Sequence, residues 1–305
     1  MGPLLFPCYT TPLGEIAQRH GIRYHIYADD TQLYASFNPR DPFDKDNALA
    51  KLTSCINEMR EWMAANYLKL NDSKTEFFVC GSAYNLKHLP PVEIKIGSAN
   101  IKPSDSIRNL GVTLNPTLSL SSHVDTLRRS INFHIKNLWR IRRYIDQNTC
   151  HHVARALITS RLDYCNAMFT VLSSKDLTRM QRLQNRAARL IFGVDRRVDA
   201  APLIHALHWL PIRKRITFKT LLYVFKVLND QGPEYMKELF SHYSPRRCLR
   251  SSSDTTRLAI PSSTTAIGNK RFQIIAAKSW NSLPTTIRTA TSIANFKKLL
   301  KTYLF

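Results

Sequence analysis

The chain has 305 residues, with 44 Lys and Arg side chains against 22 Asp and Glu, and 44% of its residues are apolar. This length and apolar content suit one or two folded domains and argue against global disorder. The six cysteines form no C-x-x-C pair, so we expect neither a disulfide framework nor a Cys-based zinc site. No apolar run approaches the roughly 18 residues of a membrane helix, so we expect no membrane span. An intracellular location, nuclear or cytoplasmic, is therefore expected.

The net charge of +22 is unevenly distributed along the chain. Residues 1–122 hold 12 basic and 12 acidic side chains, which leaves 32 basic and 10 acidic side chains for residues 123–305. Such an excess indicates a polyanionic partner, with nucleic-acid backbones favoured over anionic membrane surfaces.

The pattern of residues 1–122 predicts a mixture of helices and strands. Asp44 is expected to cap a helix that ends before Asn71, because Leu49, Leu52, Ile56, Met59 and Met63 recur at helical spacing. Short apolar runs around turn residues predict strands at 22–27, 31–37, Thr75 to Cys80, on both sides of Gly97-Ser98 within 92–101, and Leu110 to Leu114.

Residues 123–305 have a helical signal. An apolar stripe that begins at Val124 and Leu127 and runs to Ile145 predicts a long amphipathic helix, and further helices are expected at 151–169, 176–192 and 212–229. Residues 241–268 are rich in Ser, Thr, Pro and Arg without periodicity, which predicts a loop or a disordered linker. Ile293, Phe296, Leu300 and Tyr303 predict a last short basic helix.

Two adjacent carboxylates, Asp29 and Asp30, lie at the turn of the first predicted hairpin. Like charges this close resist simultaneous ionisation unless a cation neutralises them. Mg²⁺ takes one or two protein carboxylates and completes its shell with water and substrate phosphates, so the pair is a candidate metal site for phosphoryl transfer. The alternative, a solvated Asp-Asp turn, is the commoner use of the dipeptide alone.

Five basic residues at the start of and within the helix predicted at 176–192 recur at alternating spacings of four and three and therefore share one face: Lys175, Arg179, Arg182, Arg186 and Arg189. Such a row matches a phosphate backbone. The alternative is an ordinary solvated helix face, although such a face usually mixes charges of both signs.

Several segments of the chain resemble motifs of the reverse transcriptases of non-LTR (LINE-type, Jockey-like) retrotransposons, and they occur in the same order. Residues 27–34 (YADDTQLY) resemble motif C, residues 1–6 (MGPLLF) the end of motif B, and residues 70–76 (LNDSKTE) motif D. Further similar segments are 107–112 (IRNLGV), 207–212 (LHWLPI), 280–284 (WNSLP) and 296–301 (FKKLLK).

The resemblance implies a polymerase palm in which Asp29 and Asp30 hold Mg²⁺ for deoxynucleotide addition to a DNA primer 3′-OH on an RNA template. It places Tyr27 and Ala28 near the primer end, and Lys74 where an ammonium could assist the leaving pyrophosphate. A plain surface lysine remains the alternative for Lys74. The chain departs from the family pattern because the motif A aspartate and the fingers would precede its first residue, and because Asn115 stands where Asp is usual.

We therefore expect an α+β fold: a partial palm at 1–122, an all-α thumb-like region at 123–240, the loop at 241–268 and a basic C-terminal region at 269–305. The expected function is that of a fragment of an RNA-directed DNA polymerase that is inactive alone. The alternative is a non-catalytic nucleic-acid-binding module derived from a retrotransposon. The oligomeric state is left open.

Overall fold

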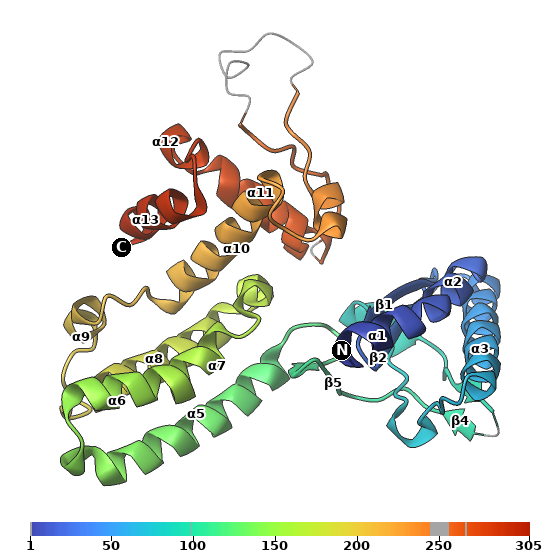
Figure 1. Cartoon of the computed structure of the whole chain (residues 1–305), viewed down its shortest axis with the longest axis horizontal. Coiled ribbons are helices and arrows are strands. Elements are labelled where there is room, and N and C mark those ends of the chain that lie inside the picture. The colour runs from blue at the N-terminus through green and yellow to red at the C-terminus, as the bar shows by residue number, and fades with distance from the viewer. Residues whose placement is uncertain (1, 98, 245–255, 266) are drawn as a thin grey trace. The chain divides into compact units, whose positions relative to one another are not determined.

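A computed structural model describes residues 2–97, 99–244, 256–265 and 267–305, and it divides the chain into two compact units. Unit 1 comprises Met1–Ile107 and Asn115–Leu118, and unit 2 comprises Arg108–Leu114 and Ser119–Phe305. The elements of unit 1 (Figure 1) are α1 (Gly2–Tyr9), α2 (Thr11–Arg19), β1 (Arg23–Tyr27), β2 (Asp30–Tyr34), α3 (Pro42–Ala65), the 3₁₀ turn η1 (Asp72–Lys74), α4 (Ala83–His88), β3 (Ile94–Ile96) and β4 (Ala99–Ile101).

The core of unit 1 forms where α2, α3 and the β1–β2 hairpin meet. Alternate residues of β1 face this core, so Tyr24 and Ile26 pack there while their neighbours are exposed. Cys55 and Met59 of α3 are buried against Ile16 of α2. The helix and hairpin predicted for this segment are thus confirmed, and their apolar faces hold them together.

Local details of unit 1 differ from the sequence prediction. The N-cap of α3 is Asp41, whose carboxylate accepts hydrogen bonds from the backbone N–H groups of Phe43 and Asp44, so Asp44 is not the cap. The strand predicted at residues 75–80 is wrong. Only Phe77 makes a β-bridge in that segment, to Pro103, because no neighbouring strand offers a ladder.

The β-structure consists of separate two-stranded hairpins in the described chain: β1–β2, β3–β4, and β5 (Ile107–Asn109) with β6 (Val112–Leu114). The β3–β4 turn confirms the hairpin predicted around residue 97, and residue 98 lies outside the described residues. Together with the many helices, these hairpins agree with the predicted α+β class.

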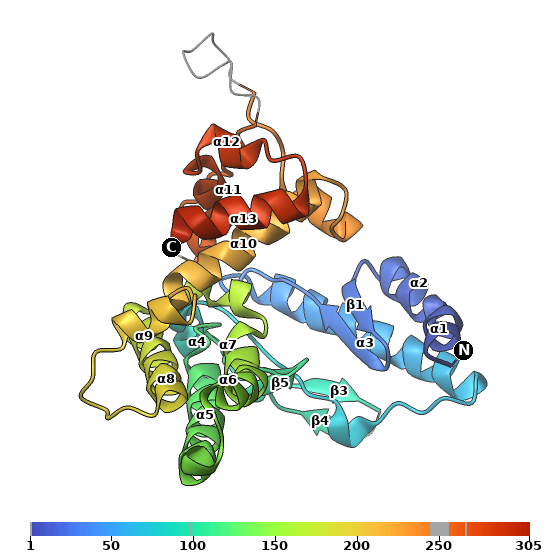
Figure 2. The ribbon, with the colours of Figure 1, turned by 60° about the vertical axis from the view of Figure 1, so that its left-hand side comes forward.

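Unit 2 is helical apart from β5 and β6. Its elements (Figures 1 and 2) are α5 (Ser121–Ile141), η2 (Arg142–Tyr144), α6 (Gln147–Ala154), a π-helical turn (Arg155–Thr159), α7 (Ser160–Asp163), η4 (Asn166–Val171), α8 (Ser174–Phe192), α9 (Ala201–Ala206), α10 (Ile212–Leu228), η5 (Glu234–Leu239), η6 (Gly268–Lys270), α11 (Phe272–Asn281), α12 (Thr285–Arg288) and α13 (Ile293–Leu304).

The first core of unit 2 lies between α5, α6 and α8. The predicted stripe of α5 is buried from Val124 to Leu138, but Ile141 is 47% exposed and ends the helix. The helix predicted at 151–169 begins earlier and is broken, since Cys165 adopts a left-handed conformation (φ 50°) that a helix interior excludes.

A second core joins α10 to the C-terminal helices, and Figure 2 shows α13 beside α10. Phe296 stacks between Phe225 and Trp280, at ring-centroid distances of 4.2 and 6.0 Å. The predicted stripe of the last helix needs one correction: Tyr303 is 51% exposed, and Leu304 is the buried residue.

The described part of 241–268 is anchored to this second core. His242 and Leu258 form an antiparallel β-bridge, and the indole N–H of Trp280 donates to the Thr256 carbonyl oxygen at 2.9 Å. Residues 245–255 and 266 of the predicted loop lie outside the described residues. Among the helices of the described ranges, none is long and apolar enough to span a membrane.

Candidate nucleic-acid interface

The two adjacent carboxylates lie at the tip of the β1–β2 hairpin. Ala28 and Asp29 form the turn, and Asp30 is the first residue of β2, paired with Tyr27 of β1. All four side chains are exposed, and Tyr27 is 61% exposed. The hairpin therefore presents both carboxylates and an aromatic ring to solvent at one end of an antiparallel pair.

The tight turn requires an unusual backbone at Ala28. Its φ of 53° lies in the left-handed region, which costs a residue with a Cβ roughly 1 kcal/mol. The core contacts of Tyr24 and Ile26 fix the register on one side of this turn, and the packing of Leu33 fixes it on the other. Packing in the hairpin stem thus holds a strained turn that carries the acidic pair.

The acidic pair fits Mg²⁺ in the kind of donor it offers. Carboxylate oxygens are hard ligands, and Mg²⁺ is commonly held by one or two of them. In the part of the chain that the structure describes, no group of three or more His, Cys, Asp or Glu side chains is placed to hold a metal ion. Asp29 and Asp30 could therefore supply ligands to an ion, while a two-metal centre would need a further donor.

Lys74, the third residue predicted to be catalytic, is the last residue of η1 and is exposed. The ion pair between Asp72 and Arg60, at 2.8 Å, ties this turn to α3. Within the described residues Lys74 makes no ion pair or hydrogen bond through its ammonium group, and none links it to Asp29 or Asp30. The structure thus leaves the hairpin tip and Lys74 as two separate exposed features.

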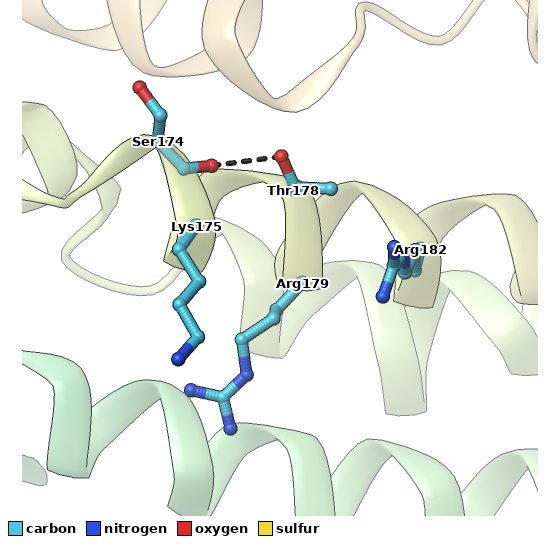
Figure 3. Close-up of a pocket in the computed structure, with 5 residues that line it drawn as sticks. All are labelled: Ser174, Lys175, Thr178, Arg179 and Arg182. Carbon is cyan, nitrogen blue, oxygen red and sulfur yellow. Dashed lines mark hydrogen bonds between the residues drawn. The ribbon is translucent and has the colours of Figure 1, made fainter.

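The basic row of α8 has mixed surroundings. Lys175 and Arg182 are exposed and have no polar partner in the described chain, whereas Arg189 donates to the Val198 carbonyl oxygen at 2.7 Å. Arg186 donates to the amide oxygen of Asn132 on α5. Figure 3 shows Lys175 and Arg179 extending from α8 toward the same side, with Arg182 farther along the helix.

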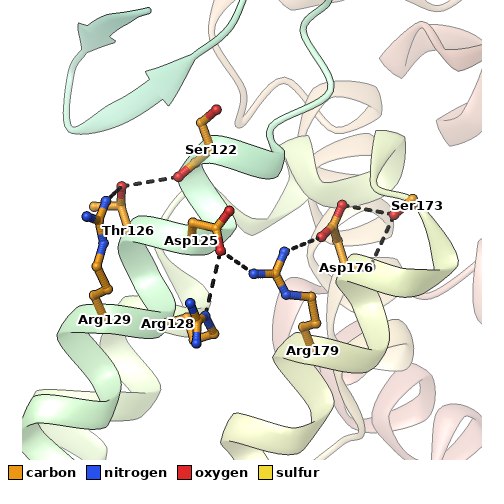
Figure 4. A network of polar contacts seen from close by, with 8 residues as sticks. All are labelled: Ser122, Asp125, Thr126, Arg128, Arg129, Ser173, Asp176 and Arg179. Carbon is orange, nitrogen blue, oxygen red and sulfur yellow. Dashed lines mark hydrogen bonds and ion pairs between the residues drawn. The ribbon is translucent and has the colours of Figure 1, made fainter.

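Arg179 belongs to an ion-pair network that joins two helices (Figure 4). Its guanidinium pairs with Asp176 on α8 at 2.9 Å and with Asp125 on α5, and Asp125 also faces Arg128 at 3.6 Å. The hydrogen bonds to Asp176 and Asp125 raise the pKa of Arg179 above its usual value. Ser173 caps α8 through the backbone N–H of Asp176 at 3.1 Å, which fixes one end of the network.

Helix α5 adds a second line of basic groups to the surface. The pairs Arg179–Asp125 and Arg186–Asn132 are one heptad apart on both helices, so α5 and α8 run in the same direction with these faces adjacent. We call this the α5–α8 surface. Its residues are Asp125, Arg128, Asn132, Lys136, Trp139 and Arg140 on α5, with Lys175, Arg179, Arg182 and Arg186 on α8.

The basic row on α8 was predicted from the sequence, whereas the contribution of α5 was not. The recurrence of 128, 132, 136 and 140 every four residues could have revealed one polar face, but no pattern in the sequence says which helices lie side by side.

Residues 1–114 match the family model described as "Reverse transcriptase (RNA-dependent DNA polymerase)". The matched range contains α1 to β6 and therefore the Tyr27 to Asp30 hairpin and Lys74. No curated protein and no solved structure matches the chain. The match supports a reverse transcriptase-like polymerase family for this range, and the helical elements from α5 onward lie beyond it.

Proposed function

We propose that this chain is part of an RNA-directed DNA polymerase of a non-LTR retrotransposon, acting on a DNA primer and an RNA template inside the cell, in the nucleus or the cytoplasm. The observation that carries the proposal is the reverse transcriptase match over residues 1–114, which includes an exposed hairpin with Asp29 and Asp30 at its tip. In the complete enzyme this pair would hold Mg²⁺, which supplies charge neutralisation for deoxynucleotide transfer.

Each residue of the hairpin has a separate proposed role. Tyr27, paired across the hairpin with Asp30, offers an exposed ring beside the primer end, with Ala28 in the turn next to it. Lys74 offers an exposed ammonium for the departing pyrophosphate. A further carboxylate, from outside these 305 residues, would complete the centre, so the isolated polypeptide is proposed to be inactive.

In this proposal the α5–α8 surface binds nucleic acid. Its cations outnumber its one acid, Asp125, and both Asp125 and the buried Asp176 of α8 are paired with Arg179. Phosphate groups would meet Lys175, Arg182 and Arg186, whose side chains are exposed. This role corresponds to the thumb in the predicted architecture.

A second candidate function is a non-catalytic nucleic-acid-binding module. Two observations favour it: the whole charge excess lies in residues 123–305, and the helices that carry the α5–α8 surface have a hydrophobic core of their own. This function would need only unit 2, whereas the polymerase needs both units.

Mapping the 5′ ends of the transcripts separates the two candidates. An upstream open frame that encodes a further palm aspartate would support the polymerase. A transcript that starts just before the codon for Met1 would instead support the binding module and contradict the first proposal.

A further inference from the structure

Trp139 is an exposed indole on α5, a helix whose apolar stripe from Val124 to Leu138 is buried. Leu138, Ile135 and Ile131 are at most 4% exposed, whereas Trp139 is 41% exposed. An indole this accessible adds little to the core, and its aromatic face is available to a ligand. Trp139 lies outside the apolar stripe of α5, on the side that meets α8.

The surroundings of Trp139 form a shallow hollow that is wide open to solvent. It measures about 660 Å³ and is lined by Asn132, Lys136, Trp139 and Arg140 of α5 and by Arg186 of α8. Three of these residues are cations and none is an acid. The hydrogen bond from Arg186 to Asn132 joins the two helices here, so the exposed guanidinium lies on the same surface as the indole.

The combination of an exposed indole with three cations matches a nucleotide. Phosphates pair with the cations, and the flat face of a nucleobase stacks on the indole. A base inside a duplex already stacks on its neighbours and cannot offer a face, so the aromatic group is of use to an unpaired nucleotide. An acidic peptide would satisfy the cations but would leave the indole without a planar partner.

We propose that the α5–α8 surface binds single-stranded nucleic acid, with an unpaired base stacked on Trp139 and the adjoining phosphates on Lys136, Arg140 and Arg186. The inference rests on the proposed contact of this surface with nucleic acid and adds to it the strand state of the ligand. It assigns Trp139 to base contact and the cations to the backbone.

The test measures binding of the full 305-residue chain by fluorescence anisotropy. The probes are oligouridine and oligothymidine of about 12 nucleotides, an abasic strand of the same charge, and a blunt duplex of equal length. Trp139→Leu keeps an apolar side chain on α5 but removes the aromatic face, and Trp139→Phe keeps a smaller one. Tyr223→Leu is the matched control, because Tyr223 is 42% exposed but lies on α10 and does not line the hollow.

We expect wild-type protein to bind the single strands more tightly than the abasic strand. Trp139→Leu should weaken oligouridine and oligothymidine binding about tenfold, with the abasic affinity and the salt dependence unchanged, because one stacked base and no phosphate contact is lost. Trp139→Phe should retain most of the affinity and Tyr223→Leu all of it. Comparison of uridine with thymidine shows whether RNA or DNA is the preferred strand.

The outcomes separate the two proposals. Equal wild-type affinity for base-bearing and abasic strands, with steep salt dependence, would overturn the stacking site and leave the phosphate contact standing. Tightest binding to the duplex would do the same. Absence of binding to every probe would refute both. If thermal melts show that Trp139→Leu does not fold, Trp139→Phe and the wild-type preference for base-bearing strands still test the stacking site.

Discussion

Arg179 of α8 pairs with Asp125 of α5 while it also pairs with Asp176 on its own helix (Figure 4). The row of cations predicted from the sequence therefore contains a member that is already neutralised from two sides. This contact both fastens α5 to α8 and reduces the positive charge of the α5–α8 surface.

The first prediction follows from this pair. Asp125→Asn should lower the stability of the chain by no more than about 1 kcal/mol, since the pair is partly exposed and Arg179 keeps Asp176. The same change should strengthen nucleic-acid binding and raise the salt slope by up to about one, because the surface loses its acid and Arg179 is left with one carboxylate partner instead of two. Thermal melts and anisotropy titrations measure the two effects. Asp230→Asn, which removes the partner of Lys237 away from this surface, is the control. Weaker binding by Asp125→Asn would contradict this interpretation.

The second prediction concerns the accessible cations of α8. Changing Arg182 and Arg186 to Ala should lower the salt slope of binding by up to about two, because each removes one candidate phosphate contact. Stability should change little, since both side chains are exposed and the buried face with Met180 and Leu183 remains. Lys297→Ala with Lys298→Ala on α13 is the control. An unchanged slope in the α8 variant would mean that the row is a solvated helix face.

The third prediction is that a purified polypeptide of these 305 residues does not extend a primer. Two-metal phosphoryl transfer needs a carboxylate beyond Asp29 and Asp30, and loss of such charge stabilisation costs several kcal/mol in the barrier. A primer-extension assay with Mg²⁺ on an RNA template measures this. Extension that is abolished by Asp29→Ala would falsify the prediction.

The fourth prediction concerns acid sensitivity at His123. This ring is buried at the junction of α5 with β6, its Nδ1 accepts the backbone N–H of Thr113 at 3.3 Å, and burial together with Arg108 lowers its pKa below the ordinary value. Its contribution to stability is complete above about pH 6.5, where the unfolded chain is also neutral, and is lost as the pH falls through the lowered folded pKa.

Urea unfolding at about pH 7.5 and about pH 5.5 checks this. The loss of stability on acidification should be smaller in His123→Gln than in the wild type. Some loss should remain, because burial also lowers the pKa values of His134 and His151. An identical pH response in the two proteins would exclude His123 as a source of the acid sensitivity.

The fifth prediction ranks the two units. Unit 1 exposes large apolar side chains, including Leu4 at 76%, Phe43 at 86% and Tyr67 at 99%, whereas unit 2 has two extensive buried cores. Limited proteolysis should therefore cleave unit 1 first and leave a helical fragment from unit 2. Survival of unit 1 with early loss of α5 to α8 would reverse the ranking.

Periodicity in the sequence predicted the long helices α3, α5, α8 and α10, the last helix α13 and most of the core-facing residues of α5. The α5 stripe from Val124 to Leu138, the buried face of α8 and the hairpin around Asp29 all follow from spacing alone, because side-chain direction repeats with the local backbone geometry. The sequence also identified the candidate acidic pair and the basic row, since both are local patterns.

Only the tertiary structure decided what each polar group does. In the sequence Arg142 is one of several cations near the end of α5. In the structure it caps the end of α8, where its guanidinium donates to the carbonyl oxygens of Leu190 and Ile191 at 2.9 and 2.8 Å. Residues 75–80 have strand-like composition and no strand partner. The exposed Trp139 has two cationic neighbours on its own helix and gains a third, Arg186, from a helix that is distant in sequence. Hydrogen bonds, ion pairs and strand ladders need a second partner, and the choice of that partner is made by packing between elements far apart in the chain.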